Sequence, residues 1–244
     1  MKAFASDFDG TLYFMWEKEK FKKEDIEQIQ SFQKEGHLFG VCTGRSLSGI
    51  INPIENKMQF DFYILASGAV ILDKSFQVIY ETVIKKDIVK DIYERYKDAV
   101  ESVIHANDTV YTFVGNYPHQ VLIQSIDDIE GDHIYGLSFG TESEEEATKI
   151  SQEINHIYGH ELKAFVNKEN IDIVSKDCSK GHALQILKEK WDIDHMSAMG
   201  DSYNDIPMLI QADTSFTFSN SPKKVQDKVN YIVSSVAEAL QMIM

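Results

Sequence analysis

Two aspartates that stand two positions apart directly follow the first apolar run of the chain. Asp7 and Asp9 belong to the segment 7–12, whose sequence is Asp-Phe-Asp-Gly-Thr-Leu. Gly10 allows a sharp turn, so both carboxylates can point at one place, where one can attack an electrophile while the other transfers protons. An acidic turn closed by glycine is the common alternative. However, Asp-x-Asp-Gly-Thr arises by chance in roughly one chain of this length in a thousand, which favours a catalytic role.

Two further segments could bind an anion. Thr43, Gly44 and Arg45 follow an apolar run and precede an expected helix, and a hydroxyl with free backbone N–H groups at a helix N-terminus attracts anions. A threonine cap at a strand-to-helix turn explains the same residues equally well. Lys180 stands at the start of another expected helix, where its ammonium could neutralise a phosphoryl oxygen or the charge of a nucleophile. Taken alone, this lysine is more simply interpreted as solvated.

The fourth segment is rich in oxygen ligands. It covers residues 200–205, Gly-Asp-Ser-Tyr-Asn-Asp, and follows an apolar run at 196–199. Asp201, Asn204 and Asp205 offer the hard oxygen atoms that suit Mg²⁺. A Gly-Asp turn with asparagine as a helix cap is the alternative, and the density of acids favours the metal site over it.

The order of apolar runs predicts how these segments are positioned. In the first half of the chain, strands are expected at 2–7, 37–43, 62–66 and 69–72, and helices at 24–35 and 45–56. Strands separated by helices indicate βαβ units and an α/β fold with a mostly parallel sheet. Each of the four segments lies at a strand end or a helix start, so all four are expected along one edge of that sheet.

The middle of the chain has a different pattern. Helices are expected at 85–100 and from Ser143 onward, together with strands at 102–105, 110–114, 134–139 and 162–166 that no helix separates one by one. This pattern indicates an α+β insert. After 171–175 the alternation of strands and helices returns. The predicted organisation is a core formed by residues 1–82 and 173–244, with an inserted domain at 83–172.

Composition and charge exclude several classes of protein. The chain has 43% hydrophobic and 26% charged residues, as ordinary folded proteins do, and its net charge of −15 disfavours nucleic acid and anionic membranes as partners. No apolar run reaches the length of a membrane span and no signal peptide pattern is visible, so a cytoplasmic location is expected. Two cysteines predict neither a disulfide framework nor a metal site. Because the net charge is negative, a phosphate substrate would need a local cation to attract it.

The basic stretch 18–23 could be taken for a binding patch. Its four lysines alternate with acids at positions 17, 19 and 24. This alternation predicts a solvated helix start instead.

In their order along the chain and in their residue types, the four segments resemble the signature motifs of the haloacid dehalogenase-like phosphatases. The insert resembles the cap of their Cof-type (IIB) branch. The resemblance covers essentially the whole chain, and no signature residue is missing. It implies a Rossmann-like three-layer α/β core with a mostly parallel sheet and an inserted α+β cap domain. It also implies hydrolysis of small phosphorylated metabolites with Mg²⁺ (Mg2+) as cofactor, by way of an aspartyl-phosphate.

The resemblance assigns a role to individual residues. Asp7 would be the nucleophile, and Asp9 would protonate the leaving group and later deprotonate the hydrolytic water. Mg²⁺ would be held by Asp7, by the backbone carbonyl of Asp9 and by Asp201, with Asp205 supporting the metal shell. The positions that match phosphate-binding residues are the backbone of Phe8, Thr43, Gly44, Lys180 and Asn204.

The charge of the insert bears on the substrate. Residues 83–172 contain eight basic and eighteen acidic residues, and the whole chain has only two arginines, Arg45 and Arg95. A second phosphate would call for an arginine cluster, so we expect a substrate with one phosphate and a neutral or polar remainder, such as a sugar phosphate. A phosphomutase on the same scaffold and a non-catalytic regulatory binding protein are the alternatives. The oligomeric state cannot be predicted.

Overall fold

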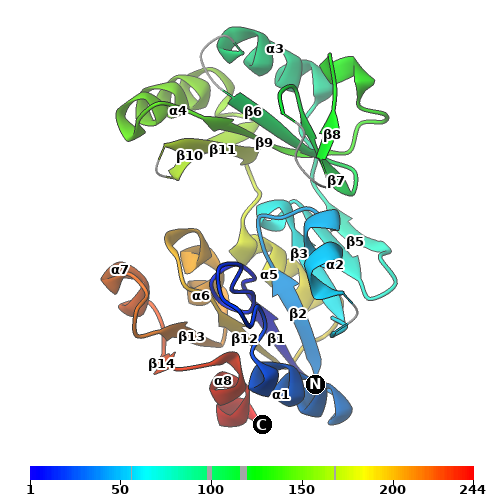
Figure 1. Cartoon of the computed structure of the whole chain (residues 1–244), viewed down its shortest axis with the longest axis vertical. Coiled ribbons are helices and arrows are strands. Elements are labelled where there is room, and N and C mark those ends of the chain that lie inside the picture. Colours follow the sequence, from blue (N-terminus) through cyan, green and yellow to red (C-terminus); the bar gives the residue numbers. More distant parts are fainter. Residues whose placement is uncertain (56, 98–100, 116–119, 168) are drawn as a thin grey trace. The chain divides into compact units, whose positions relative to one another are not determined.

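The apolar runs at 2–7 and 37–43 form central strands of an eight-stranded sheet (Figure 1). The computed structural model describes residues 1–55, 57–97, 101–115, 120–167 and 169–244. The described residues divide into a core unit, 1–44, 54–80 and 179–244, and an insert unit, 45–53 and 81–178. The predicted insert, 83–172, lies inside the insert unit. That it acts as a substrate-specificity cap stays a prediction.

The sheet of the core unit is mostly parallel, which confirms the predicted fold class. Its strand order is β14-β13-β12-β1-β2-β3-β4-β5, and the pairs from β14 to β3 are parallel, whereas β4 is antiparallel to β3. The strands are β1 (Lys2–Ser6), β2 (Leu38–Cys42), β3 (Phe62–Leu65), β4 (Val70–Asp73), β5 (Val78–Glu81), β12 (His195–Met199), β13 (Thr214–Phe218) and β14 (Tyr231–Val233).

Helices pack on both faces of this sheet. They are α1 (Lys23–Lys34), α5 (Lys180–Lys190), α6 (Ile206–Gln211), α7 (Lys223–Gln226) and α8 (Val236–Ile243). Because side chains alternate along a strand, Ala3 and Ala5 of β1 pack on the side of α5 and α6, whereas Phe4 points to the other face. There the Phe4 ring stacks on those of Phe39 and Phe216, at centroid distances of 5.5 and 6.0 Å. The result is a three-layer core.

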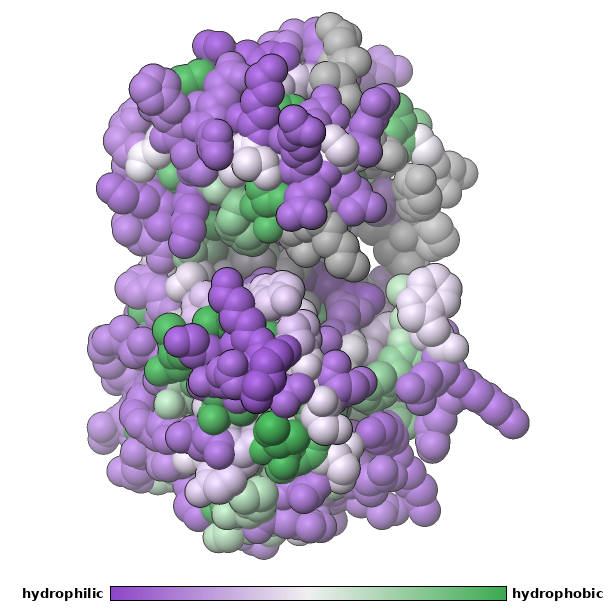
Figure 2. Space-filling model, turned by 90° about the vertical axis from the view of Figure 1, so that its left-hand side faces the viewer, coloured by the Kyte–Doolittle hydropathy of each residue, from purple (hydrophilic) through white to green (hydrophobic). Residues whose placement is uncertain are grey.

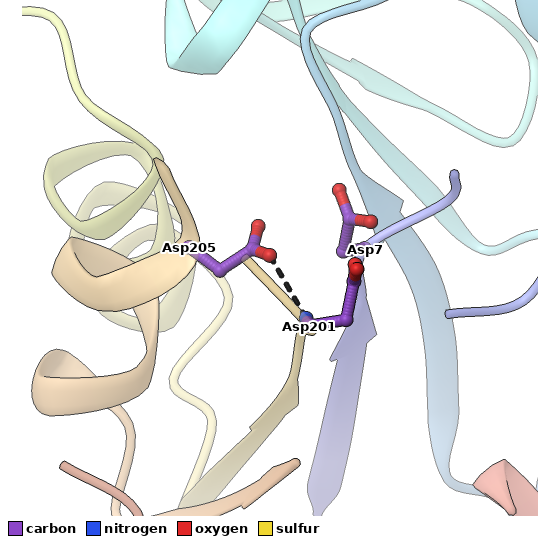
Figure 3. A group of neighbouring side chains, drawn as sticks. All are labelled: Asp7, Asp201 and Asp205. Atoms are coloured by element: carbon purple, nitrogen blue, oxygen red, sulfur yellow. Dashed lines mark hydrogen bonds between the residues drawn. The ribbon is translucent and has the colours of Figure 1, made fainter. Parts of the chain in front are cut away.

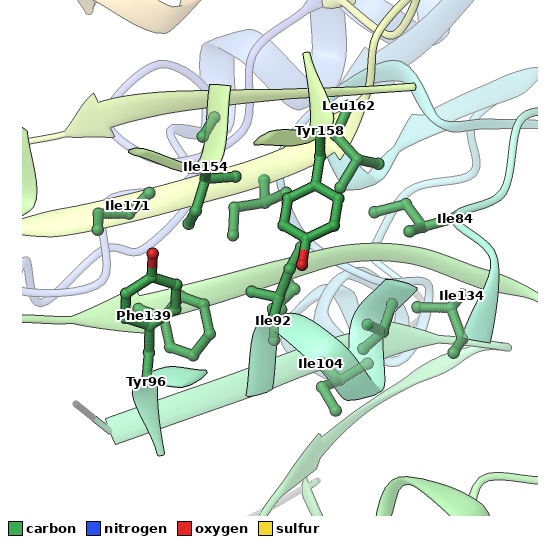
Figure 4. Packing of buried hydrophobic residues seen from close by; sticks show 14 of the residues in the cluster. Ile84, Ile92, Tyr96, Ile104, Ile134, Phe139, Ile154, Tyr158, Leu162 and Ile171 are labelled. Atoms are coloured by element: carbon green, nitrogen blue, oxygen red, sulfur yellow. The ribbon is translucent and has the colours of Figure 1, made fainter. Parts of the chain in front are cut away.

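The insert unit contains a six-stranded sheet in the order β10-β11-β9-β6-β7-β8. The strands are β6 (Glu101–Ala106), β7 (Thr109–Thr112), β8 (Gln120–Leu122), β9 (Ile134–Gly140), β10 (Leu162–Asn167) and β11 (Asn170–Ser175), and the helices are α2 (Ser48–Ile54), α3 (Lys86–Tyr96) and α4 (Glu144–Tyr158). Isoleucines and aromatic rings from α3, α4 and the strands form one core (Figure 4). The expected α+β character is thus present.

Some element boundaries differ from the expected ones. The helix expected at 45–56 covers only Ser48–Ile54: residues 45–47 have no regular secondary structure, and Asn56 lies outside the described residues. The helix expected at 85–100 is described as α3, and residues 98–100 are also outside the described part. Ser143 caps α4 as expected, since its hydroxyl accepts a hydrogen bond from the Glu146 N–H at 3.2 Å.

The face of the molecule drawn in Figure 2 is largely hydrophilic. Most of the side chains visible in Figure 2 are polar, and the apolar ones form small separate groups. Within the described residues, no helix combines the length and the apolar character that crossing a membrane requires.

A buried carboxylate joins the two helices α1 and α8. Asp25, in the first turn of α1, is 1% exposed, and its Oδ1 accepts a hydrogen bond from the Ala237 N–H in the first turn of α8 at 2.7 Å. Its Oδ2 is buried without a hydrogen-bond partner among the described residues. Burial raises the pKa of Asp25 from 3.8 to about 6, against the opposing effect of the bond from Ala237. The folded protein therefore holds this proton to a higher pH than the unfolded chain does.

We expect Asp25→Asn to stabilise the protein at pH 8 and not at pH 4. Protonated Asp25 adds to the free energy of unfolding. This contribution is complete below pH 3.8 and is lost as the pH rises to about 6. Asparagine removes this loss and keeps the acceptor for Ala237, so the free energy of unfolding should rise by about 1–3 kcal/mol at pH 8. Denaturant unfolding at both pH values measures it. Glu24→Gln, which changes an exposed acid in the same turn, is the control, and an equal effect of both variants would contradict the prediction.

Candidate active site

Three neighbouring parallel strands end at the same edge of the core sheet, and each carries one of the predicted motifs. Asp7 follows β1, Thr43 follows β2, and Asp201 follows β12 after one glycine. The order β12-β1-β2 places Asp7 in the middle, and its N–H donates to the Met199 carbonyl at 2.8 Å. Figure 3 shows the carboxylates of Asp7, Asp201 and Asp205 gathered at this edge. The sequence motifs therefore meet where a parallel sheet binds ligands.

Lys180 connects two of these carboxylates. Its Nζ donates to Asp7 Oδ1 and to Asp205 Oδ1, both at 2.6 Å. The lysine side chain is 2% exposed, and those of Asp7 and Asp205 are 8% and 0% exposed. The lysine begins α5, where Ser179 caps the helix through a bond from the His182 N–H at 3.0 Å. A buried lysine that reaches two acids is ordered, so the solvated interpretation of Lys180 is wrong.

Three carboxylates surround this single lysine. One oxygen each of Asp7, Asp201 and Asp205 lies within 4.8 Å of the others. Burial raises the pKa of Asp7 from 3.8 to about 8, helped by repulsion from Asp205 and opposed by Lys180. Burial, followed by repulsion from Asp205, also raises the pKa of Asp201. Burial alone would lower the pKa of Lys180, but attraction to Asp205 and Asp7 raises it. The three carboxyl groups can therefore carry more negative charge than Lys180 neutralises. Their oxygen atoms fit a divalent cation such as Mg²⁺.

Asp205 organises the loop that follows β12. Its Oδ2 accepts hydrogen bonds from the N–H groups of Asp201 and Ser202, both at 3.0 Å, while its Oδ1 accepts from Lys180. A Cβ on Gly200 would lie 2.5 Å from the Asp205 carboxyl carbon, so only glycine allows this approach. Both oxygens of Asp205 are engaged within the protein. This geometry suits the supporting role that the sequence predicted for it.

The turn after Asp7 packs directly on Asp201. Gly10 has a φ of +83°, and a Cβ at this position would lie 2.9 Å from Asp201 Oδ2. Thr11 is fully buried, and its hydroxyl donates to Asp201 Oδ1 at 3.1 Å. Sequence reasoning assigned no role to Thr11, although it stood inside the first motif. The structure shows that it orients the Asp201 carboxylate.

We expect Gly10→Ala to impair catalysis more than stability. A left-handed φ costs an alanine about 1–2 kcal/mol, and the added Cβ would push Asp201 away, which should lower turnover by about 10- to 100-fold. Gly36→Ala is a matched control, because Gly36 also has a φ of +83° but no atom within 4 Å of its would-be Cβ. Unfolding and turnover of both variants should show similar losses of stability and a loss of activity for Gly10→Ala alone. Equal activities would show that the contact with Asp201 is unimportant.

The other predicted site residues lie on the same edge of the sheet. Thr43 is 2% exposed, and its N–H donates to the Ile64 carbonyl at 2.9 Å. Asp9 is exposed and forms an isolated bridge with Tyr13. Asn204 is exposed, and its side-chain oxygen accepts from the Ser202 hydroxyl. The roles predicted for Phe8, Asp9, Thr43, Gly44 and Asn204 stay predictions.

One supporting segment was missed. The short 3-10 helix η1 (Ala66–Gly68) follows β3, and the Ser67 N–H donates to the Thr43 carbonyl at 2.9 Å. Gly68 has a φ of +102°, and a Cβ there would lie 2.4 Å from the Ser179 carbonyl oxygen. Gly68 thus lets this segment pack against the start of α5, which carries Lys180. The run of small residues between two apolar segments was the available signal.

Comparisons with known proteins agree with this geometry. The family model described as haloacid dehalogenase-like hydrolase matches residues 4–239. Two relatives are named 5-amino-6-(5-phospho-D-ribitylamino)uracil phosphatase. YcsE of Bacillus subtilis (strain 168) is 23% identical over 98% of this chain and 92% of its own length. YbjI of Escherichia coli (strain K12) is 23% identical over 96% of this chain and 91% of its own length.

Solved structures share the fold. A haloacid dehalogenase-like hydrolase from Bacteroides thetaiotaomicron has a TM-score of 0.86 at 20% identity and covers 100% of this chain and 99% of its own. The phosphatase BT1666 from the same organism has a TM-score of 0.83 at 22% identity, with coverages of 99% and 94%.

The relatives named as phosphatases confirm the predicted enzyme class, which is phosphoric monoester hydrolase. The family match runs through both units and includes all four motifs, so the protein belongs to the haloacid dehalogenase-like hydrolases, in their Cof-type branch.

Proposed function

We propose that the protein is a Mg²⁺-dependent phosphatase that hydrolyses small phosphate monoesters through an aspartyl-phosphate on Asp7. The observation that carries this proposal is the buried contact between Lys180 and Asp7, at the carboxyl end of the central strand and beside Asp201. A carboxylate held in this way can attack phosphorus in line with the leaving oxygen.

Asp7 and Asp201 would hold the metal through their carboxylates and Asp9 through its backbone carbonyl, with Asp205 behind them. When bound, Mg²⁺ supplies the positive charge that keeps Asp7 ionised and offsets its repulsion from a phosphate dianion. Lys180 contributes a fixed positive charge on the other side of Asp7, held by Asp205. Because this lysine is already oriented, the site needs little reorganisation when charge develops in the transition state.

The reaction proceeds in two steps. An oxygen of Asp7 forms a bond to phosphorus while the bond from phosphorus to the leaving oxygen breaks, and Asp9 gives its proton to that oxygen. A water molecule then attacks phosphorus and loses a proton to Asp9, which releases inorganic phosphate and restores Asp7. The exposed position of Asp9 beside the buried Asp7 is compatible with exchange of protons with incoming molecules.

We further propose a substrate with one phosphate and a neutral, hydroxyl-rich remainder. Residues 83–172 carry ten more acidic than basic residues, which disfavours a second phosphate. The compound in the names of the relatives YcsE and YbjI carries one phosphate on a ribityl chain and so has this chemistry, as sugar phosphates do.

The aromatic residues of the insert are better explained as core than as groups that stack on a substrate. They are Tyr111, Phe113, Tyr135 and Phe139. Phe139 is fully buried, and the Phe113 ring stacks on that of Tyr93. Tyr117 lies outside the described residues.

The test is phosphate release from a panel with Mg²⁺ or with EDTA. The panel contains sugar phosphates, 5-amino-6-(5-phospho-D-ribitylamino)uracil, nucleotides, flavin mononucleotide, pyridoxal phosphate and a sugar bisphosphate. The proposal expects turnover only with Mg²⁺, with a monophosphate as the best substrate. A bisphosphate that is best by a wide margin would refute the substrate proposal. Isomerisation of a hexose phosphate, or binding without turnover, would favour the mutase or the regulatory alternative. A cytoplasmic location stays a prediction.

A further inference from the structure

Several lysines gather around a groove of the core unit that shares no residue with the carboxylate cluster. A surface groove with a volume of about 490 Å³ runs along the loop before α1 and the segment after α2. Its size falls in the range of small-molecule sites. Four lysines line it, Lys18, Lys20, Lys23 and Lys57, with only two acids, Glu19 and Glu55. In a chain with 24 basic and 39 acidic residues, this local excess of positive charge is unusual.

The lysines of the groove are available to a ligand. Lys23 and Lys57 form weak surface pairs, with Glu27 at 3.3 Å and Glu55 at 3.2 Å, and all four of these side chains are at least 45% exposed. Within the part of the chain that the structure describes, neither Lys18 nor Lys20 forms an ion pair. The alternating charges at 17–24 predicted a solvated segment, but the fold adds Lys57 from a distant part of the chain. The sequence pattern could not show this addition.

The floor of the groove connects to the catalytic turn. Phe21 lines the groove, is 5% exposed, and has the Lys57 Nζ 5.7 Å from its ring centroid. On its inner side the Phe21 ring lies 6.0 Å from that of Phe8 and 5.1 Å from that of Tyr13. Phe8 stands between Asp7 and Asp9, and its carbonyl accepts bonds from the N–H groups of Leu12 and Tyr13 at 3.0 and 2.7 Å. The three rings therefore brace the turn that carries the nucleophile.

We infer that this groove, which we call the lysine groove, binds a small phosphate-bearing anion and thereby lowers the activity of the catalytic turn. Phosphate groups match several ammonium groups around one concave surface. An anion there draws Lys57 away from the Phe21 ring and loosens the contact between Phe21 and Phe8. The effect on turnover rests on the proposed phosphatase function, whereas binding does not.

Binding is tested first, by equilibrium dialysis against methylenebisphosphonate at low ionic strength in EDTA. The bridging carbon makes this probe resistant to hydrolysis, and without a divalent cation the carboxylate cluster repels it, so the groove is the site that remains. We expect one molecule bound per chain. Lys18→Gln combined with Lys20→Gln should weaken binding by about tenfold or more. Lys74→Gln with Lys228→Gln, two exposed lysines elsewhere on the core unit, should change it less than about twofold.

Turnover is tested second, with Mg²⁺ in large excess over the bisphosphonate. A probe that competes at the active site raises the apparent KM only, whereas occupation of the lysine groove lowers kcat at saturating substrate. We expect kcat to fall at least about twofold in the parent protein and in the control pair, and not in the Lys18/Lys20 pair. Absence of saturable binding in EDTA, or equal weakening in both pairs, would refute the site. Binding without any change in kcat would refute the coupling. Because dialysis measures binding alone, it decides whether the site exists even if the protein has no phosphatase activity.

Discussion

Asp7→Asn is expected to abolish turnover, with a loss of about 10⁴-fold or more. Asparagine cannot form the acyl-phosphate bond, and no other described carboxylate occupies its place at the end of β1, where Lys180 Nζ lies 2.6 Å from Asp7 Oδ1. The fold should survive, since the asparagine oxygen can still accept from Lys180 and the substitution removes a carboxyl group whose ionised form is disfavoured by burial and by Asp205. In EDTA the free energy of unfolding should therefore be equal to that of the parent or higher.

The measurement combines phosphate release, with the best substrate of the panel, and denaturant unfolding. Asp177→Asn, at an exposed aspartate of the insert unit, is the control for loss of a negative charge and should keep full activity. If Asp7→Asn retained more than about a tenth of the parent turnover while Asp9→Asn lost it, the assignment of the nucleophile to Asp7 would have to be abandoned.

Lys180→Met is expected to affect both stability and activity. Methionine fills much of the same space but leaves Asp7 and the fully buried Asp205 without their shared cation. Removing one partner of a buried ion pair costs about 3–5 kcal/mol, because the remaining charge stays desolvated. Turnover should fall by about 10³-fold, the cost of removing a fixed charge that acts on the transition state.

Lys188→Met is a matched control on the same helix. Lys188 pairs with Asp213 at 2.6 Å, but both side chains are 33% exposed, so we expect a loss below about 1 kcal/mol and no change in turnover. Unfolding in EDTA and in Mg²⁺ should show that the metal restores part of the stability lost in Lys180→Met, because it compensates the same carboxylates. Equal costs for the two substitutions would mean that the buried lysine does not hold the acidic cluster together.

The main elements of the site could be predicted because each motif stands at the end of an apolar run or at the start of a helix. A parallel sheet brings such ends to one edge, so Asp7, Thr43 and Asp201 could be placed together although they are far apart in the chain. The same argument could not reveal how Asp205 divides its two oxygens between Lys180 and the loop N–H groups. That arrangement depends on the close approach at Gly200, which is a property of packing and not of spacing.

Other features were missed for different physical reasons. The short edge strands β5 and β8 have no length over which an alternating pattern could be seen, and β8 has two exposed apolar residues, Val121 and Leu122. The C-terminal helix α8 was not predicted, although Ser235 caps it through the Glu238 N–H at 3.0 Å. The burial of Asp25 against α8 could not be foreseen either, because an acid in the first turn of a helix is usually solvated.

The central place of β1 has a consequence for how the protein is made. β1 is synthesised before its neighbour β12, which follows about 190 residues later in the chain. The six strands of the insert sheet, by contrast, all come from the continuous stretch 101–175.

Since long-range pairings form slowly, the insert sheet is expected to fold before β1 pairs with β12. Pulsed hydrogen exchange during refolding would then protect the amides of β9 and β11 before those of β1, and the reverse order would refute this sequence of events. The contact between Asp7 and Lys180 would thus form late in the synthesis of each new chain, so an incomplete chain could not yet hydrolyse phosphate esters.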